Sequence, residues 1–291
     1  RKTMQKTKIE WCDSTWNPIT GCRFGCSYCY AKKIAERFGT IPCENSNCIW
    51  CQDCKENPQT GFKCEAYEPI EKIHTLDEKQ YQFNPKRMLP FPYGFEPIFH
   101  RYRLDEPQKA KKPQRIFVVS MGDMFGDWVP EYWITEVFDA CRKAPQHKYM
   151  FLTKNPKRYK SLLWDRLLPE EPNFFYGTTI NRESQLDEAF WCWDQGVHTF
   201  LSIEPILEPF SMNGYDLPSV FTHDLVIIGA ETGNRKEKVI PEASWIKPIV
   251  KETKSMNGRV FMKESLLPVM GEDDMLRELP LNLMTKKEIH K

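Results

Sequence analysis

The sequence predicts an α/β fold, a partial (βα) barrel of six to seven parallel strands that carries an irregular, Cys-rich insertion. From residue 115 onward, short apolar runs rich in β-branched residues alternate with amphipathic stretches of helical period. Near-continuous apolar runs are typical of strands buried on both faces, as in a parallel sheet covered by helices. Their alternation with helices predicts successive βα units. The count falls short of the eight strands that close a barrel, which favours a partial one.

The elements are expected in a regular order. One strand precedes Cys22, and the next six are expected at 116–120, 149–153, 174–178, 199–203, 225–229 and 260–263. Helices are expected at 30–38, 130–143, 156–168, 182–193 and 243–256. Residues 39–114 break every periodicity and contain many prolines and five cysteines. We expect this stretch to be an insertion ordered by its own metal, within a single domain that covers residues 1–291.

Composition limits the classes of function. The 291 residues carry a net charge of +1, which gives no electrostatic case for nucleic-acid binding or for a membrane surface, although a local basic groove is compatible with it. No apolar run is long enough to span a bilayer, and no signal-peptide pattern opens the sequence. The expected location is therefore the cytoplasm.

Cysteines carry the strongest signal. Eight of the eleven lie between Cys22 and Cys64, and clustered cysteines in a cytosolic chain favour metal binding or catalysis over disulfides. Cys22, Cys26 and Cys29 have the spacing C-x3-C-x2-C, with Tyr28 before the third. Three thiolates can hold three irons of a cubane cluster and leave the fourth iron open, which is typical of a reactive site. From spacing alone, a zinc site with a distant fourth ligand or a disulfide also stays possible.

A second group of cysteines lies in the insertion. Its central run, C-x2-C-x2-C, resembles a ferredoxin-type set of ligands, and paired C-x2-C units also suit tetrahedral zinc. We expect four of the five to hold either an auxiliary iron–sulfur cluster or zinc; the group consists of Cys43, Cys48, Cys51, Cys54 and Cys64.

Charged residues follow several of the apolar runs. Lys154, Glu204 and Glu231 come within two residues after an expected strand, and Lys263 is the last residue of one. Lys and Glu are not favoured helix caps, so capping does not explain them. In α/β barrels the chemistry lies at the carboxyl ends of the strands. The pattern predicts a charged rim over the barrel mouth.

The cysteine spacing, with Tyr28 in its place, resembles the radical S-adenosylmethionine superfamily, in which S-adenosylmethionine chelates the open iron of a four-iron four-sulfur cluster. Phrases from residue 9 to about 265, among them Leu201–Pro205 and Gly229–Gly233, resemble a phage-associated three-cysteine-motif branch of unknown function. Many members of that branch have their first two cysteines further apart. This chain has the tighter spacing of the mainstream enzymes.

The resemblance implies a set of cofactor contacts. Gly122 and Asp123 would face the amino group of S-adenosylmethionine, although their segment lacks the paired glycines usual in the superfamily. The full expected cofactor-binding set is Tyr28, Gly122, Asp123, Thr179, Asn181, Gly229 and Glu231. The candidate catalytic residues, expected on the substrate side, are Lys154, Glu204 and Lys263.

The expected function is cleavage of S-adenosylmethionine and abstraction of hydrogen from an unidentified substrate. The expected partner is an electron donor such as flavodoxin or ferredoxin, and no membrane is involved. Two alternatives stay open. One is a radical S-adenosylmethionine enzyme acting on nucleic acid, in repair or base modification. The other is a non-catalytic, metal-stabilised binding protein.

Overall fold

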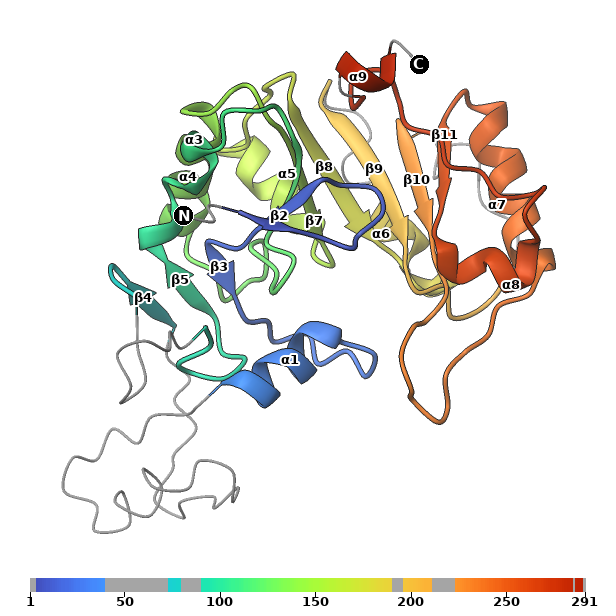
Figure 1. Cartoon of the computed structure of the whole chain (residues 1–291), viewed down its shortest axis with the longest axis horizontal. Helices are drawn as coiled ribbons and strands as arrows, with labels where there is room; N and C mark the ends of the chain where they lie inside the picture. Colours follow the sequence, from blue (N-terminus) through green and yellow to red (C-terminus); the bar gives the residue numbers. More distant parts are fainter. Residues whose placement is uncertain are drawn as a thin grey trace.

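The computed structural model describes residues 4–39, 73–79, 90–189, 196–210, 223–284 and 286–289. In this part of the chain the main sheet has eight strands in the order β1-β2-β6-β7-β8-β9-β10-β11. Their bounds are β1 Gln5–Lys6, β2 Ser14–Trp16, β6 Arg115–Val118, β7 Lys148–Thr153, β8 Phe174–Thr179, β9 His198–Ile203, β10 Leu225–Ile228 and β11 Arg259–Met262. Only β1 runs antiparallel to its neighbour, and β2 to β11 are parallel. The sheet curls into a half-barrel (Figure 1), which confirms the predicted partial barrel.

The strands pack on both faces, as their apolar sequences predict. On one face, α4 and α5 cover a core that includes Ile116 and Val118, and α7 covers a second core around Val226. Residues of alternate register, such as Phe117, point to the other face, where Trp11 packs with its ring centroid 4.8 Å from that of Phe117. The inner face of the half-barrel is therefore filled by side chains. In α/β barrels the site lies at the carboxyl ends of the strands.

Helices follow the strands in the expected order. Their bounds are α1 Tyr30–Phe38, α3 Glu106–Lys109, α4 Glu131–Arg142, α5 Lys157–Trp164, α6 Leu186–Ala189, α7 Ala243–Ser255, α8 Leu267–Met270 and α9 Lys286–Ile289, with 3-10 turns η1 Arg101–Arg103, η2 Glu183–Gln185 and η5 Glu264–Leu266. No helix in the described ranges is long and apolar enough to cross a bilayer.

One helix is shorter than its periodicity predicts. The apolar pattern favours a helix to residue 168, but α5 ends at Trp164. Arg166 has φ +58°, and the amide of Leu167 donates to the Leu162 carbonyl at 2.7 Å. This bond, with that from Arg166 to Leu163, is the C-terminal capping pattern that reverses the chain in the left-handed region. Periodicity alone does not encode that reversal.

A small sheet leads into the cysteine-rich region. β3 Ile19–Thr20, β5 Ile98–His100 and β4 His74–Leu76 pair in that order. Two of its strands fall in the range expected to be an insertion. The second cysteine group, Cys43 to Cys64, lies outside the described residues, so the second metal site stays a prediction. Figure 1 shows α1 beyond the ends toward which the parallel strands point, where a barrel builds its site.

Candidate functional site

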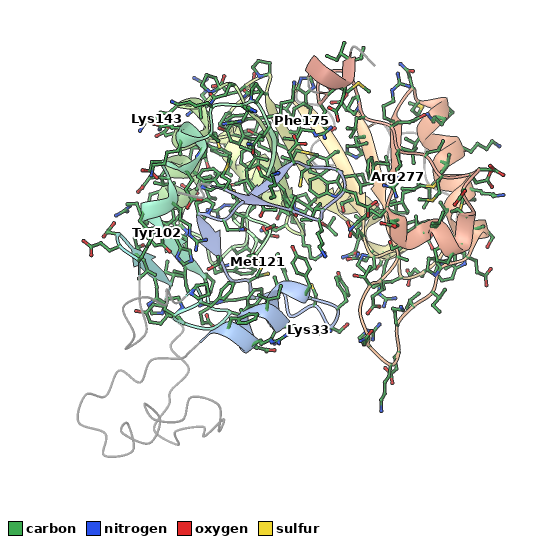
Figure 2. All side chains as sticks on the ribbon, viewed as in Figure 1. Lys33, Tyr102, Met121, Lys143, Phe175 and Arg277 are labelled. Atoms are coloured by element: carbon green, nitrogen blue, oxygen red, sulfur yellow. The ribbon has the colours of Figure 1, made fainter. Side chains whose placement is uncertain are left out.

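The loop of residues 21–29 joins β3 to α1 and crosses the end of β6. Gly21 has φ +89° and pairs with Gly122 in an isolated parallel bridge, and its amide donates to the Met121 carbonyl at 2.9 Å. A Cβ on Gly122 would lie 2.6 Å from the Gly21 carbonyl oxygen, and one on Gly21 would lie 2.1 Å from that of Glu96. Both positions need glycine, because backbone approaches too closely for any side chain. Figure 2 shows Met121 between the strands of the large sheet and α1.

The three cysteines of this loop are free and half-buried. Cys29 is the N-cap of α1, where its sulfur accepts the Lys32 amide at 3.4 Å. The pKa of Cys22 is raised to about 12, by burial first and then by the charges of Asp123, Cys26 and Cys29. The three sulfurs therefore lie within electrostatic reach of one another.

The three thiols are the ligand type that an iron–sulfur cluster takes. Among the described residues, no three His, Cys, Asp or Glu side chains surround one point as ligands of a single metal ion. A cubane takes each cysteine on a different iron, so its ligands stand further apart. The other described cysteines, Cys12 and Cys141, are buried, and burial raises the pKa of Cys12 to about 12. Within the described ranges the loop thus offers three thiols and no fourth, which fits a cubane with one open iron.

Asp123 is buried at the end of β6, and its carboxylate is bonded inside the protein. Oδ1 accepts the Thr153 hydroxyl at 2.8 Å and the Phe125 amide at 3.0 Å, and Oδ2 accepts the Lys154 amide at 2.9 Å. Burial raises the pKa of Asp123, and these hydrogen bonds oppose that shift. The carboxylate therefore ties the end of β7 to the end of β6.

Tyr28, Lys154 and Asn181 meet above β7 and β8. The Tyr28 hydroxyl donates to Asn181 Oδ1 at 2.5 Å, and the Lys154 ammonium lies 3.4 Å from the same oxygen. Lys154 Nζ also lies 5.5 Å from the centroid of the Tyr28 ring. Desolvation lowers the pKa of Lys154, and the charges of Cys26, Asp123, Cys22 and Cys29 oppose that shift. The structure thus brings the cysteine loop together with the ends of two strands.

Glu204 and Lys263 form a second polar group, above β9 to β11. Their side chains form an ion pair across Gly229. A Cβ on Gly229 would lie 3.1 Å from Lys263 Cδ and 3.2 Å from Glu204 Cγ. The Lys263 side chain is 15% exposed and the Glu204 side chain 27%, so the pair is partly accessible.

Two expected contact residues are enclosed. Thr179 is buried at the end of β8. Glu231 binds Arg235 with both oxygens, at 2.6 and 2.7 Å, and this hydrogen bonding is the main cause of its lowered pKa. Its side chain is only 3% exposed. Glu231 shapes the loop after β10, which Figure 1 shows in orange reaching the level of α1.

Sequence reasoning missed Tyr30. Its hydroxyl donates to the Ser120 carbonyl at 2.6 Å, although 51% of the residue is exposed. Burial of the hydroxyl and then the charge of Glu204 raise its pKa. The Tyr30 hydroxyl is therefore within electrostatic reach of both Glu204 and Cys29. Its position next to Cys29, at the first residue of the helix, was the available signal.

The sequence matches the family described as "Protein of unknown function (DUF5131)" over residues 6–265, and the chain belongs to that family. A search of the curated proteins found no match.

Among solved structures, the chain is similar to two of spore photoproduct lyase. One is a double mutant with bound AdoMet and dinucleoside spore photoproduct, with TM-score 0.44 and 11% identity over 88% of this chain and 64% of that one. The other is a complex with dinucleoside spore photoproduct, with TM-score 0.44 and 10% identity over 87% and 63%. The chain thus spans just under two thirds of these proteins. Likeness at this level leaves the chemistry to be argued from the residues of this chain.

Proposed function

We propose that this protein is a radical S-adenosylmethionine enzyme. The observation that carries the proposal is the loop of three free thiols, Cys22, Cys26 and Cys29, held at the carboxyl ends of a half-barrel with no fourth cysteine beside it in the described residues. Such a set would hold a four-iron four-sulfur cluster with one iron open. When bound, the cluster supplies the electron that cleaves S-adenosylmethionine, and the carbon radical formed abstracts hydrogen from the substrate.

The residues at the carboxyl ends of the strands form two groups, one above β6 to β8 and one above β9 to β11, and we assign them different roles. Above β6 to β8, Asp123, Lys154 and Asn181 are bonded to one another and to the cysteine loop, so they support the cofactors. Above β9 to β11, Glu204 and Lys263 form a partly accessible ion pair, so they would contact the substrate. Lys154 was expected on the substrate side, and we now propose that it serves the cofactor side.

The expected contacts with S-adenosylmethionine divide in the same way. Gly229 lies beneath the ion pair, whose side chains fill the space that a Cβ would enter, so a flat ring would reach its backbone only after these side chains move. Asp123 and Glu231 have their carboxylates bonded inside the protein, so their proposed role is to position neighbouring groups. Gly122 and Thr179 would shape the wall of the site, because one lies against Gly21 and the other is buried.

The proposed electron donor is a small acidic protein such as flavodoxin or ferredoxin. Helix α1 begins at the residue after Cys29 and carries Lys32, Lys33 and Arg37 against one acidic residue, Glu36. All four are exposed, and Lys32 lies 3.9 Å from Glu36. Complementary charge steers association and weakens with salt. The rate of cluster reduction by flavodoxin should therefore fall as ionic strength rises.

One observation favours nucleic acid as the substrate. The loop after β10 exposes Lys236 and Lys238, and Lys33 of α1 is close enough to affect the pKa of Glu231 at the base of this loop. Lysines on both sides of a mouth suit a phosphate backbone. Binding of single-stranded DNA or RNA that falls steeply with salt, and that Lys236→Ala weakens, would support this candidate.

The test of the proposed function is a cleavage assay on protein purified without oxygen. Iron, sulfide and zinc are measured first, and then the production of 5′-deoxyadenosine from S-adenosylmethionine under a chemical reductant. We expect about four irons on the loop and measurable cleavage. Replacing Cys22, Cys26 and Cys29 by Ala should abolish both, whereas the matched control Cys141→Ala, deep in the core, should keep both. A fully loaded cluster that cannot cleave S-adenosylmethionine would leave the non-catalytic binding protein as the correct class.

A further inference from the structure

The Tyr28 side chain connects the cysteine loop to a strand end of the large sheet by a hydrogen bond. It lies between Cys26 and Cys29 in sequence, and its hydroxyl reaches Asn181, just past β8. This hydrogen bond has a donor–acceptor distance of 2.5 Å and joins residues that are 153 positions apart in the sequence. A loop held mainly by backbone contacts at its start, such as the bond from the Cys22 amide to Phe95, is thereby also held near its end.

Both ends of the Asn181 side chain are bonded within the protein. Oδ1 accepts the Tyr28 hydroxyl and faces the Lys154 ammonium, and Nδ2 donates to the Pro205 carbonyl at 2.7 Å. Its backbone amide donates to Gln185 at 2.7 Å. An amide side chain with its partners satisfied on both ends holds a fixed orientation. The side-chain oxygen of Asn181 is therefore oriented toward Tyr28.

Lys154 completes the group with a positive charge. Its backbone amide is fixed by Asp123 at 2.9 Å, and its ammonium lies against both the Tyr28 ring and Asn181 Oδ1. A cation over an aromatic face is attracted to it, more so when half-buried. The ammonium is thus held beside the loop that carries the three thiols.

We propose that Tyr28, Asn181 and Lys154 form a polar latch that sets the position of the cysteine loop before any cluster is present and keeps a positive charge beside it. Tyr28 and Asn181 are positioning residues, and Lys154 supplies the charge. The charge half of this inference rests on the proposed function. The positioning half does not, because it concerns the loop of the metal-free protein.

The positioning half is tested on metal-free protein by hydrogen–deuterium exchange of the peptides that cover residues 21–38. Tyr28→Phe removes the hydroxyl and keeps the ring under Lys154. It should speed exchange in these peptides about fivefold to tenfold, the effect of losing one buried hydrogen bond. The matched control, Tyr149→Phe, removes a buried hydroxyl that donates to Ala144 at 2.8 Å, far from the loop, and should leave these peptides unchanged. Unchanged exchange in Tyr28→Phe would overturn the latch whether or not the protein is an enzyme.

The charge half is tested by the reduction potential and the electron paramagnetic resonance spectrum of the reconstituted cluster. Reduction adds a negative charge, which a nearby cation stabilises, so Lys154→Met should shift the potential to more negative values. Lys154→Arg, which keeps the charge, should restore it. A potential that is equal in all three proteins would refute the charge role. Failure of the wild-type chain to take up a cluster would instead refute the proposed function and leave the exchange result standing.

Discussion

Glu204 and Lys263 form an ion pair that lies across the bare backbone of Gly229, so the ends of three neighbouring strands meet in one contact. Both side chains are mostly buried, and each keeps a part of its surface exposed. An ion pair so placed contributes little net stability, because desolvation offsets the Coulomb attraction. Because it lies at the carboxyl ends of β9 and β11, we propose for it a role in binding.

Removing either partner should leave the other charge uncompensated in a partly desolvated place. We expect Glu204→Gln or Lys263→Met to lower the free energy of unfolding by about 1–3 kcal/mol, and the double variant to lose less than the sum. Chemical denaturation of the four proteins in a double-mutant cycle measures the coupling. The double variant should still cleave S-adenosylmethionine without turning over substrate. Additive losses would show that the two side chains do not interact.

Gly229→Ala should disturb the same contact without removing a charge. A Cβ at 3.1 Å from Lys263 and 3.2 Å from Glu204 forces both flexible side chains to shift by a few tenths of an ångström. We expect a small loss of stability, about 1 kcal/mol or less, because the neighbours can move. The ratio of substrate turnover to S-adenosylmethionine cleavage should fall. An unchanged ratio would place the substrate elsewhere in the mouth.

Much of the fold could be predicted from the sequence, because the strands of a parallel sheet that is buried on both faces appear as apolar runs. Leu225–Ile228 is apolar at every position and forms β10, which is paired on both sides, with β9 and β11. The end of α5 was not readable, since it depends on the left-handed backbone of Arg166, a residue with no preference for that conformation.

For the site, the sequence allowed a prediction of which residue types lie at the strand ends, but not of the partners that they contact. Lys154, Glu204 and Lys263 follow β7, β9 and β11, and their partners come from elements distant in sequence. Glu231 forms an ion pair with Arg235, four residues later, and this pair holds the start of the loop after β10. Tyr30 was read as an ordinary helix residue, because nothing local shows that its hydroxyl bonds Ser120, 90 positions away.

The second cysteine group gives a prediction that depends on the sequence alone. Replacing Cys48 and Cys51 by Ala should remove either zinc or a second set of irons from the anaerobically purified protein. The iron on Cys22, Cys26 and Cys29 should remain, since these ligands lie on a separate loop. Metal analysis of the variant beside the wild type checks this. Equal metal content in the two proteins would leave these cysteines without a metal.

His223 should make the protein sensitive to acid. It is buried, its Nδ1 lies 2.9 Å from the Thr199 hydroxyl, and burial lowers its pKa from 6.5 to about 4. Above pH 6.5 the ring is neutral in both the folded and the unfolded chain and has no effect. As pH falls from 6.5 to 4, the unfolded chain takes up a proton that the folded chain excludes, so the free energy of unfolding drops by roughly 2–3 kcal/mol. His223→Asn keeps a polar group for Thr199 and cannot titrate. Denaturant unfolding at pH 7.5 and 4.5 should show a smaller loss for this variant than for the wild type. An equal loss in both proteins would mean that His223 is not the group that titrates.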